Sequence, residues 1–168
     1  MVVLAGLVAY LLLPAAQAAC PKVKQVDDPF DGTLIRSIET DMGTVVSERG
    51  TITLRSFAST IGATRVVLPA GYSLELKLAD DSSVVLTSLS AAVPTSRATE
   101  YAVYTSWQLQ DGITVEQLER LATLDMTASR YKPLLNPDSA AYDMNIIAPK
   151  MQKKLRASFQ CALEMVES

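Results

Sequence analysis

The sequence predicts an α+β fold, with a mainly antiparallel β-sheet or meander of about six to eight strands, a short helix and a long C-terminal helix. Three observations lead to this prediction. Short segments rich in β-branched and aromatic residues alternate with turn residues between positions 33 and 107. Residues 114–122 have the capping residues and the apolar spacing of a helix. Beyond residue 143, apolar residues recur every three or four positions, which indicates a second helix.

The N-terminus predicts a signal peptide over residues 1–18. An uncharged apolar run fills most of it, and Ala16 and Ala18 then match the A-x-A pattern of a signal peptidase site, although no Lys or Arg precedes the run. Cleavage between Ala18 and Ala19 leaves residues 19–168 as a single exported domain, long enough to form a core. The alternative is an uncleaved membrane anchor, for which the run is shorter than the roughly 20 residues that a spanning helix needs.

The two cysteines, Cys20 and Cys161, are predicted to form a disulfide bond. The exported domain holds an even number of cysteines, and the signal peptide indicates an oxidising compartment, so the protein is expected to be periplasmic or secreted. The alternative is a membrane-anchored lipoprotein, in which Cys20 carries a lipid and Cys161 is a free thiol. Gln17 argues against this alternative, because a bacterial lipobox usually has Leu three residues before the lipidated cysteine.

The first half of the chain reads as successive strands. The clearest is residues 72–78, where apolar and polar side chains alternate and one face is therefore apolar. Asp80 and Asp81 turn the chain into residues 84–87, which predicts a β-hairpin. The Asp-Gly pair at 111–112 is expected to end a later strand. The other expected strands are residues 33–38, 43–48, 51–55, 64–68, 101–107 and 124–131.

Two helices are expected to follow. Thr114 predicts the start of the first, because Gln117 stands three residues later at the spacing of a capping box. This helix is expected to end near Ala122. Pro149 should begin the C-terminal helix at its first turn or kink a longer one. The spacing places Cys161 on the flank of the apolar stripe, where a returning N-terminal segment could reach it. The apolar stripe consists of Met144, Ala148, Met151, Leu155, Phe159, Ala162 and Val166.

The composition excludes several kinds of chemistry. The chain contains no histidine, which rules out Ser-His-Asp catalysis, Cys-His catalysis and zinc sites built on histidine. The formal net charge of -3 does not indicate a nucleic-acid partner. No motif indicates a cofactor or a catalytic residue.

The acidic loop near the N-terminus is the candidate for a metal site. Asp27, Asp28 and Asp31 could hold a hard cation such as Ca²⁺ through oxygen ligands. They lack the D-x-D-x-D-G spacing and the later bidentate Glu of a calcium loop, so a solvent-exposed Asp-Pro turn is the favoured interpretation. Asp80 and Asp81 resemble an acid-base pair, but a hairpin tip explains both, and their pKa values are expected to be ordinary.

An aromatic strand and a basic helix flank are the other candidate surfaces. Tyr101 and Trp107 fall on one side of the strand and Tyr104 on the other. An aromatic platform for glycan or peptide is one interpretation, and burial of Tyr101 and Trp107 in the core is the favoured one. The last helix carries a basic flank that could touch anionic lipid, with a solvated helix face as the ordinary explanation. Its members are Lys150, Lys153, Lys154 and Arg156.

The order of these elements resembles that of small exported bacterial proteins of unknown function. The resemblance covers most of residues 19–168 and implies no activity. The segments that carry it are Asp28-Pro29-Phe30, Tyr72 to Asp80, and Thr114 to Ala122.

Two functions of different classes are consistent with the sequence. The first is a non-enzymatic binding or accessory module of the bacterial cell envelope, with a protein partner on the sheet face or on an edge strand. The second is a Ca²⁺-dependent or carboxylate-based enzyme or binder that uses the loop from Asp27 to Asp31. Membrane contact is expected only if Cys20 is lipidated or the signal peptide is retained.

Overall fold

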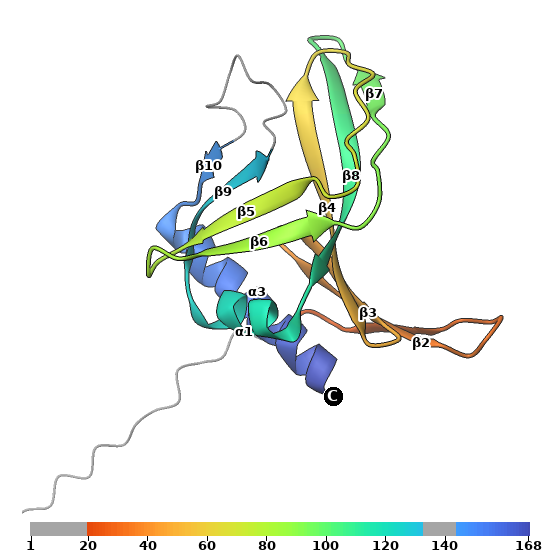
Figure 1. The fold of residues 1–168 in the computed structure, drawn as a ribbon, viewed down its shortest axis with the longest axis vertical. Coiled ribbons are helices and arrows are strands. Elements are labelled where there is room, and N and C mark those ends of the chain that lie inside the picture. Colours follow the sequence, from red (N-terminus) through yellow and green to blue (C-terminus); the bar gives the residue numbers. More distant parts are fainter. Residues whose placement is uncertain (1–19, 133–143) are drawn as a thin grey trace, which may run out of the picture.

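The computed structural model describes residues 20–132 and 144–168, so the predicted signal peptide and its cleavage site at Ala18 and Ala19 lie outside the described residues. The predicted α+β class is confirmed, because one antiparallel sheet packs against a short helix and a C-terminal helix (Figure 1). The sheet has 10 strands rather than six to eight. The strands are β1 (Lys24–Asp27), β2 (Leu34–Thr40), β3 (Gly43–Glu48), β4 (Thr51–Ile61), β5 (Ser73–Leu78), β6 (Ser83–Ser88), β7 (Thr95–Ala98), β8 (Val103–Ile113), β9 (Met126–Lys132) and β10 (Met144–Ile146), and the helices are α1 (Val115–Thr123) and α3 (Pro149–Glu167).

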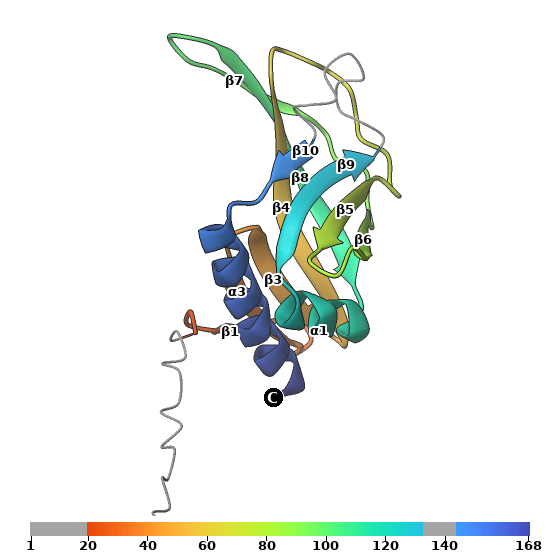
Figure 2. The same ribbon diagram turned by 90° about the vertical axis from the view of Figure 1, so that its left-hand side faces the viewer.

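The strands lie in the spatial order β1-β2-β3-β4-β8-β6-β5-β9-β10, with β7 paired to the start of β8. The longest strands, β4 and β8, have 11 residues each and pair from Ile52 opposite Ile113 to Ile61 opposite Tyr104. β6 meets β8 only near the end of each strand, and there the sheet bends, so that β5 and β6 cross β4 and β8 at a steep angle in Figure 1. The sheet therefore curls around one face, and α1 and α3 pack together against that face (Figure 2).

The strands differ from the prediction where local sequence carries little information. β1, β7 and β10 were not predicted, and β1 and β7 are exposed at every position, so no alternating pattern marks them. Residues 64–68 do not form a strand, because only Leu68 pairs there, with Ala92. β4 and β8 each extend six residues beyond their predicted ends. In β8 the extension runs through the Asp-Gly pair at 111–112, because Asp111 faces inward and Gly112 continues the pairing with β4.

The main core lies between the sheet and the two helices. The capping box of α1 is confirmed, since the Thr114 hydroxyl accepts a hydrogen bond from the Gln117 backbone N–H at 3.1 Å and the Gln117 side chain accepts one from the Thr114 N–H at 3.0 Å. α3 begins at Pro149, as predicted. α1 buries Leu118 and Leu121 completely, and α3 buries Phe159 completely.

A second, smaller core lies toward the far end of β4 and β8. Trp107 and Leu109 from β8 pack there with Ala58 from β4 and with Tyr72. Leu68 and Ala92 complete this core. The Trp107 indole N–H donates to the Val66 carbonyl at 2.8 Å, so the loop after β4 is held over the inner face of β8. The two cores meet at Tyr131 of β9, which packs against both.

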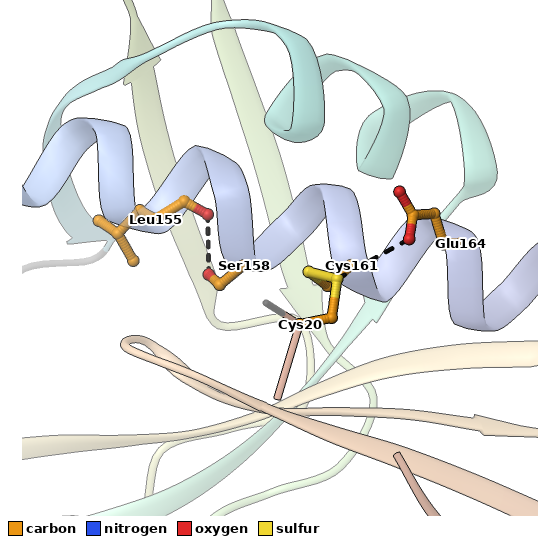
Figure 3. The surroundings of a disulfide bond; sticks show 5 residues. All are labelled: Cys20, Leu155, Ser158, Cys161 and Glu164. Carbon is orange, nitrogen blue, oxygen red and sulfur yellow. Dashed lines mark hydrogen bonds between the residues drawn. A yellow bond between two sulfur atoms is a disulfide. The ribbon is translucent and has the colours of Figure 1, made fainter. Parts of the chain in front are cut away.

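The predicted disulfide between Cys20 and Cys161 is present, with a Cα–Cα distance of 5.5 Å (Figure 3). It ties the segment before β1 to the fourth turn of α3, across 141 residues of sequence. The predicted flank position of Cys161 is wrong: the residue is 7% exposed and belongs to the main core. The reason is that α3 packs against β2 and α1 on neighbouring sides, which widens its buried face. The Glu164 carboxylate lies 3.8 Å from the exposed Cys20 sulfur.

Candidate functional site: a cleft between two open strand edges

The strand β4 has one edge that is only half paired. β3 pairs with β4 from Glu48 opposite Thr51 to Thr44 opposite Arg55 and then ends. Gly43, where β3 begins, has a φ of +143°, and a Cβ there would lie 2.1 Å from the Arg55 carbonyl oxygen, so only glycine fits this close approach. Within the described residues, the edge of β4 from Phe57 to Ile61 therefore has no strand partner on the β3 side.

The strand β10 provides a second open edge. β10 pairs with β9 through Ile146 opposite Ala128 and Asn145 opposite Ser129. Ile147 extends this pairing, because its N–H donates to the Thr127 carbonyl at 3.0 Å. No strand of the described part of the chain pairs with the other edge of β10, which is the end of the sheet.

A cleft of about 540 Å³ separates these two edges. β4 contributes Phe57, Ala58 and Ser59 to its wall, and β9 and β10 contribute Tyr131 and Ile146, among others. The first turns of α3 and the turn between β2 and β3 close its lower end. The cleft therefore lies where one more strand could pair with β10 on one side and with the open edge of β4 on the other.

The backbone of β4 directs the polar groups of its open edge toward this cleft. The Phe57 carbonyl accepts a hydrogen bond of 3.4 Å from the Tyr131 hydroxyl, whereas the Gly62 N–H donates to the Val103 carbonyl of β8 at 2.8 Å. Because successive residues of a strand direct their N–H and C=O groups to opposite edges, Phe57, Ser59 and Ile61 face the open side and the residues between them face β8. A row of backbone donors and acceptors thus lines one wall.

The side chains of the cleft are mostly uncharged. Phe57 is 68% exposed and Ile146 is 76% exposed, which is high for large apolar side chains. Met151 of α3 is also exposed. The lining carboxylate, Asp41, forms an ion pair of 2.7 Å with Lys154. An occupant of this cleft would therefore meet backbone hydrogen-bonding groups and apolar side chains.

Behind the cleft lies a buried polar cluster formed by Ser56, Asp111 and Tyr131. Asp111 is 1% exposed, and neither of its carboxylate oxygens has a hydrogen bond of ordinary geometry. Burial raises the pKa of Asp111 to about 6, and the neighbouring Ser56 hydroxyl opposes part of this increase. Burial also raises the pKa of Tyr131 to about 12, with a further contribution from the Asp111 charge, so its phenol stays neutral and can donate to Phe57.

This cluster supports the floor of the cleft. Tyr131 stacks on Tyr72 with ring centroids 5.7 Å apart, which holds its hydroxyl against β4. Ser56 is 2% exposed and is therefore almost as deeply buried as Asp111. A substrate has no direct access to either side chain. A sequence signal for Asp111 does exist: Trp107, Leu109 and Ile113 alternate around it at the spacing of inward-facing strand positions.

Asp27 is the last residue of β1, and Asp28 and Asp31 lie in the turn between β1 and β2. The Asp28 carboxylate accepts the Phe30 N–H at 2.8 Å, and the Asp31 carboxylate accepts the Thr33 N–H at 2.9 Å and pairs with Arg49. These are turn interactions of the kind that aspartate makes with nearby backbone. Throughout residues 20–132 and 144–168, no three His, Cys, Asp or Glu side chains gather in a way that could hold a metal ion, and Asp27 is part of no such group.

The hairpin and aromatic predictions are partly corrected. Hydrogen bonds from Ser82 lower the pKa of Asp80, which was expected to be ordinary. Trp107 is buried as predicted, but Tyr101 is 90% exposed, because it lies in the turn between β7 and β8 rather than in the strand. Tyr104 is on the outer face and partly exposed.

The basic flank of α3 is divided by ion pairs. Lys154 pairs with Asp41, and Arg156 pairs with Asp125 at 3.1 Å. Lys150 and Lys153 are exposed. The flank therefore does not form one continuous basic surface.

The described part of the chain contains no helix with the length and apolar character of a membrane span. In comparisons with known proteins, no protein-family model, no curated protein and no solved structure matches the chain, so the cleft is interpreted from its own residues.

Proposed function

We propose that this chain is an exported, non-enzymatic binding module of the cell envelope, which takes an extended segment of a partner protein into the cleft between β4 and β10. The observation that carries the proposal is the open edge of β4, where Phe57 and Ser59 direct backbone groups into the cleft and Ile61 continues the same edge. An unpaired strand edge is a template for another strand, and addition of a strand to a sheet edge is a common mode of peptide recognition.

The geometry of the cleft defines the segment that fits. The open edge from Phe57 to Ile61 matches a strand of about five residues. Alternate side chains of such a strand point to opposite faces, so one set would face Tyr131 and Leu155 inside the cleft. Because the Asp41 carboxylate is already paired with Lys154, we expect this inward set to be apolar and uncharged.

The disulfide supports the exported location. A bond between Cys20 and Cys161 persists in an oxidising compartment such as the periplasm or the extracellular space. The same sulfur of Cys20 cannot carry a lipid and a disulfide at once. A periplasmic or secreted protein is therefore favoured over a membrane-anchored lipoprotein.

The test compares two substitutions of one residue. Ser59→Pro removes the N–H that faces the cleft, on an edge where proline is tolerated, and Ser59→Ala removes only the hydroxyl. Heptapeptides selected from a random display library on the exported domain serve as the probe. We expect the selected peptides to bind the Ser59→Ala variant like the unmodified protein and to bind Ser59→Pro at least about tenfold more weakly.

Amide hydrogen exchange gives an independent measurement. In the free protein the Ser59 amide should exchange much faster than those of Ala58 and Thr60, and bound peptide should slow it. Urea unfolding of both variants checks that each is folded. Equal peptide affinity of the two variants, or protection of Ser59 in the free protein, would contradict the proposal.

A further inference from the structure

The end of the sheet farthest from the helices carries exposed apolar side chains. This distal end consists of residues 60–68 and 91–106: the end of β4, the loop that follows it, the loop after β6, β7, and the turn into β8 (Figure 1). Tyr101 is 90% exposed and Ile61 is 72% exposed. The exposed apolar side chains of the distal end are Ile61, Val66, Val67, Val93, Tyr101 and Tyr104.

These side chains lie on both sides of the sheet. Ile61 of β4 is paired with Tyr104 of β8, and both are exposed on the outer face, opposite to buried Trp107. On the inner side, the Val66 carbonyl accepts the Trp107 indole N–H, so the loop with Val66 and Val67 covers that face. Val93 is beside this loop because Leu68 and Ala92 exchange backbone hydrogen bonds of 3.0 and 2.9 Å.

The charge of the distal end differs from that of the whole chain. Its only charged residues are Arg65, Arg97 and Glu100, a net charge of +1, whereas the whole chain has -3, which leaves -4 on the remainder. Both arginines are exposed, and neither forms an ion pair with any described residue. Arg97 is opposite Tyr104 in the pairing of β7 with β8, so it flanks the apolar outer row.

We propose that the distal end docks on a membrane surface that contains anionic lipid. Tyr101, Ile61 and the neighbouring valines would enter the headgroup region, where tyrosine is favoured, and Arg65 and Arg97 would contact lipid phosphates. The negative remainder is repelled by the same surface, which orients the molecule with its distal end toward the lipid. The distal end borders the cleft at Ile61, but the lipid contact uses exposed side chains and does not depend on strand addition.

The arrangement favours a lipid surface over a protein partner. A protein partner covers one face of an edge or sheet, whereas a membrane interface surrounds both faces of an inserted tip, and here both faces are apolar. The insertion stays shallow, because unpaired strand edges are not tolerated in the hydrocarbon layer. The chain therefore binds at the interface and does not cross it by this end.

Vesicle co-sedimentation tests the proposal on the disulfide-bonded exported domain. The probes are phosphatidylcholine vesicles with and without phosphatidylglycerol. We expect binding to the anionic vesicles that weakens as salt is added. The double substitution Ile61→Ser with Tyr101→Ser should reduce the binding by about tenfold or more. Arg65→Gln with Arg97→Gln should remove most of the difference between the two vesicle types.

A matched control is available at the opposite side of the molecule. Val26 in β1 is 59% exposed and Phe30 in the following turn is 96% exposed, again one aliphatic and one aromatic side chain. The double substitution Val26→Ser with Phe30→Ser should leave vesicle binding unchanged. Equal losses for both double variants would overturn the proposal, as would absence of binding of the folded protein to anionic vesicles.

Two further measurements separate the alternatives. Trp107 is the one tryptophan of the chain and lies under the distal loop, so brominated lipids should quench its fluorescence in bound protein. A concentration-dependent dimer that the distal double substitution abolishes, without vesicle binding, would instead assign this surface to a second copy and overturn the lipid assignment. Ser59→Pro should leave vesicle binding intact, so failure of the cleft proposal is distinguishable from failure of this one.

Discussion

The carboxyl group of Asp111 lies on the inward face of β8, where its neighbours are the Ser56 hydroxyl and the Tyr131 phenol. A carboxylate buried without a cation or a well-formed hydrogen bond destabilises the fold when it is charged. Tyr131 connects this residue to the cleft, because its hydroxyl donates to the Phe57 carbonyl on the open edge of β4. Asp111 therefore supports the cleft through Tyr131 and does not stabilise the core when it is charged.

The effect of Asp111 on stability has a defined sign. Its pKa is about 6 in the folded protein and about 3.9 in the unfolded chain, so the folded state binds more protons between these values. The stability that neutral Asp111 provides is present below about pH 4 and is lost as the pH rises through 6, a loss on the order of 3 kcal/mol by pH 8. Asp111→Asn should abolish this part of the pH dependence and make the variant relatively more stable at pH 8.

Urea unfolding from pH 4.5 to pH 8 measures this difference. The comparison between variant and unmodified protein separates Asp111 from Glu75, which acts in the opposite direction at the acidic end of this range. Hydrogen bonds from Arg130 and Lys132 lower the pKa of Glu75 to about 2, so the stability that it provides is lost as the pH falls below about 4.5. Parallel pH curves for Asp111→Asn and the unmodified protein would show that Asp111 is not the group that titrates.

Among the secondary-structure elements, α1 owes its start to local interactions and its stability to packing. The side chains of Thr114 and Gln117 satisfy each other's backbone N–H groups, and Leu118 and Leu121 are completely buried. The Gln117 amide also donates to the Val85 carbonyl at 2.9 Å, which ties the helix to β6. The Gln117 side chain therefore both caps the start of the helix and fixes the helix to the sheet.

Loss of the cap has a predictable cost. Thr114→Ala leaves the Gln117 N–H without its acceptor and should lower the free energy of unfolding by about 1 kcal/mol. Thr123→Ala is the control, because the Thr123 hydroxyl donates to the Glu119 carbonyl inside the helix and caps nothing. Chemical denaturation of both variants checks the prediction, which fails if the two substitutions cost the same.

For the whole molecule, the disulfide joins both ends of the described chain. In the chain-entropy model, closing a loop of 141 residues stabilises the fold by at most about 5 kcal/mol. Cys20 precedes β1, which is the edge strand of the sheet, and Cys161 lies on the core-facing side of α3. The disulfide therefore holds this edge of the sheet against the helix. The two cores, the cleft and the distal end then belong to one curled sheet.

Export and the disulfide are tested by the mass of the mature protein. We expect the protein recovered from the periplasm or medium to begin at Ala19 and to accept no alkylating reagent before reduction and two equivalents after it. Two reactive thiols without reduction would contradict the disulfide. A diacylglycerol increment on Cys20 would establish the lipoprotein instead.

The sequence by itself determined the features that depend on neighbouring residues. The alternation at residues 72–78, the capping box at Thr114 and the proline start of α3 are local signals, and the structure confirms all three. The even cysteine count likewise predicted the disulfide, since two cysteines leave one pairing. An edge strand was among the expected binding surfaces, but the sequence did not indicate which strand.

The tertiary structure decided which edges stay open and which side chains are buried. β4 and β8 reach 11 residues because they pair with each other, although the two strands are far apart in sequence. Because β3 begins only at Gly43, it pairs with β4 no further than Arg55 and leaves the rest of that edge open. The burial of Asp111 follows from the pairing of β4 with β8, the exposure of Tyr101 from the pairing of β7 with β8, and the cleft beside Phe57 from the short pairing of β3. The physical reason is that strand edges and cores are completed by residues distant in sequence, whereas caps and turns are completed by residues close in sequence.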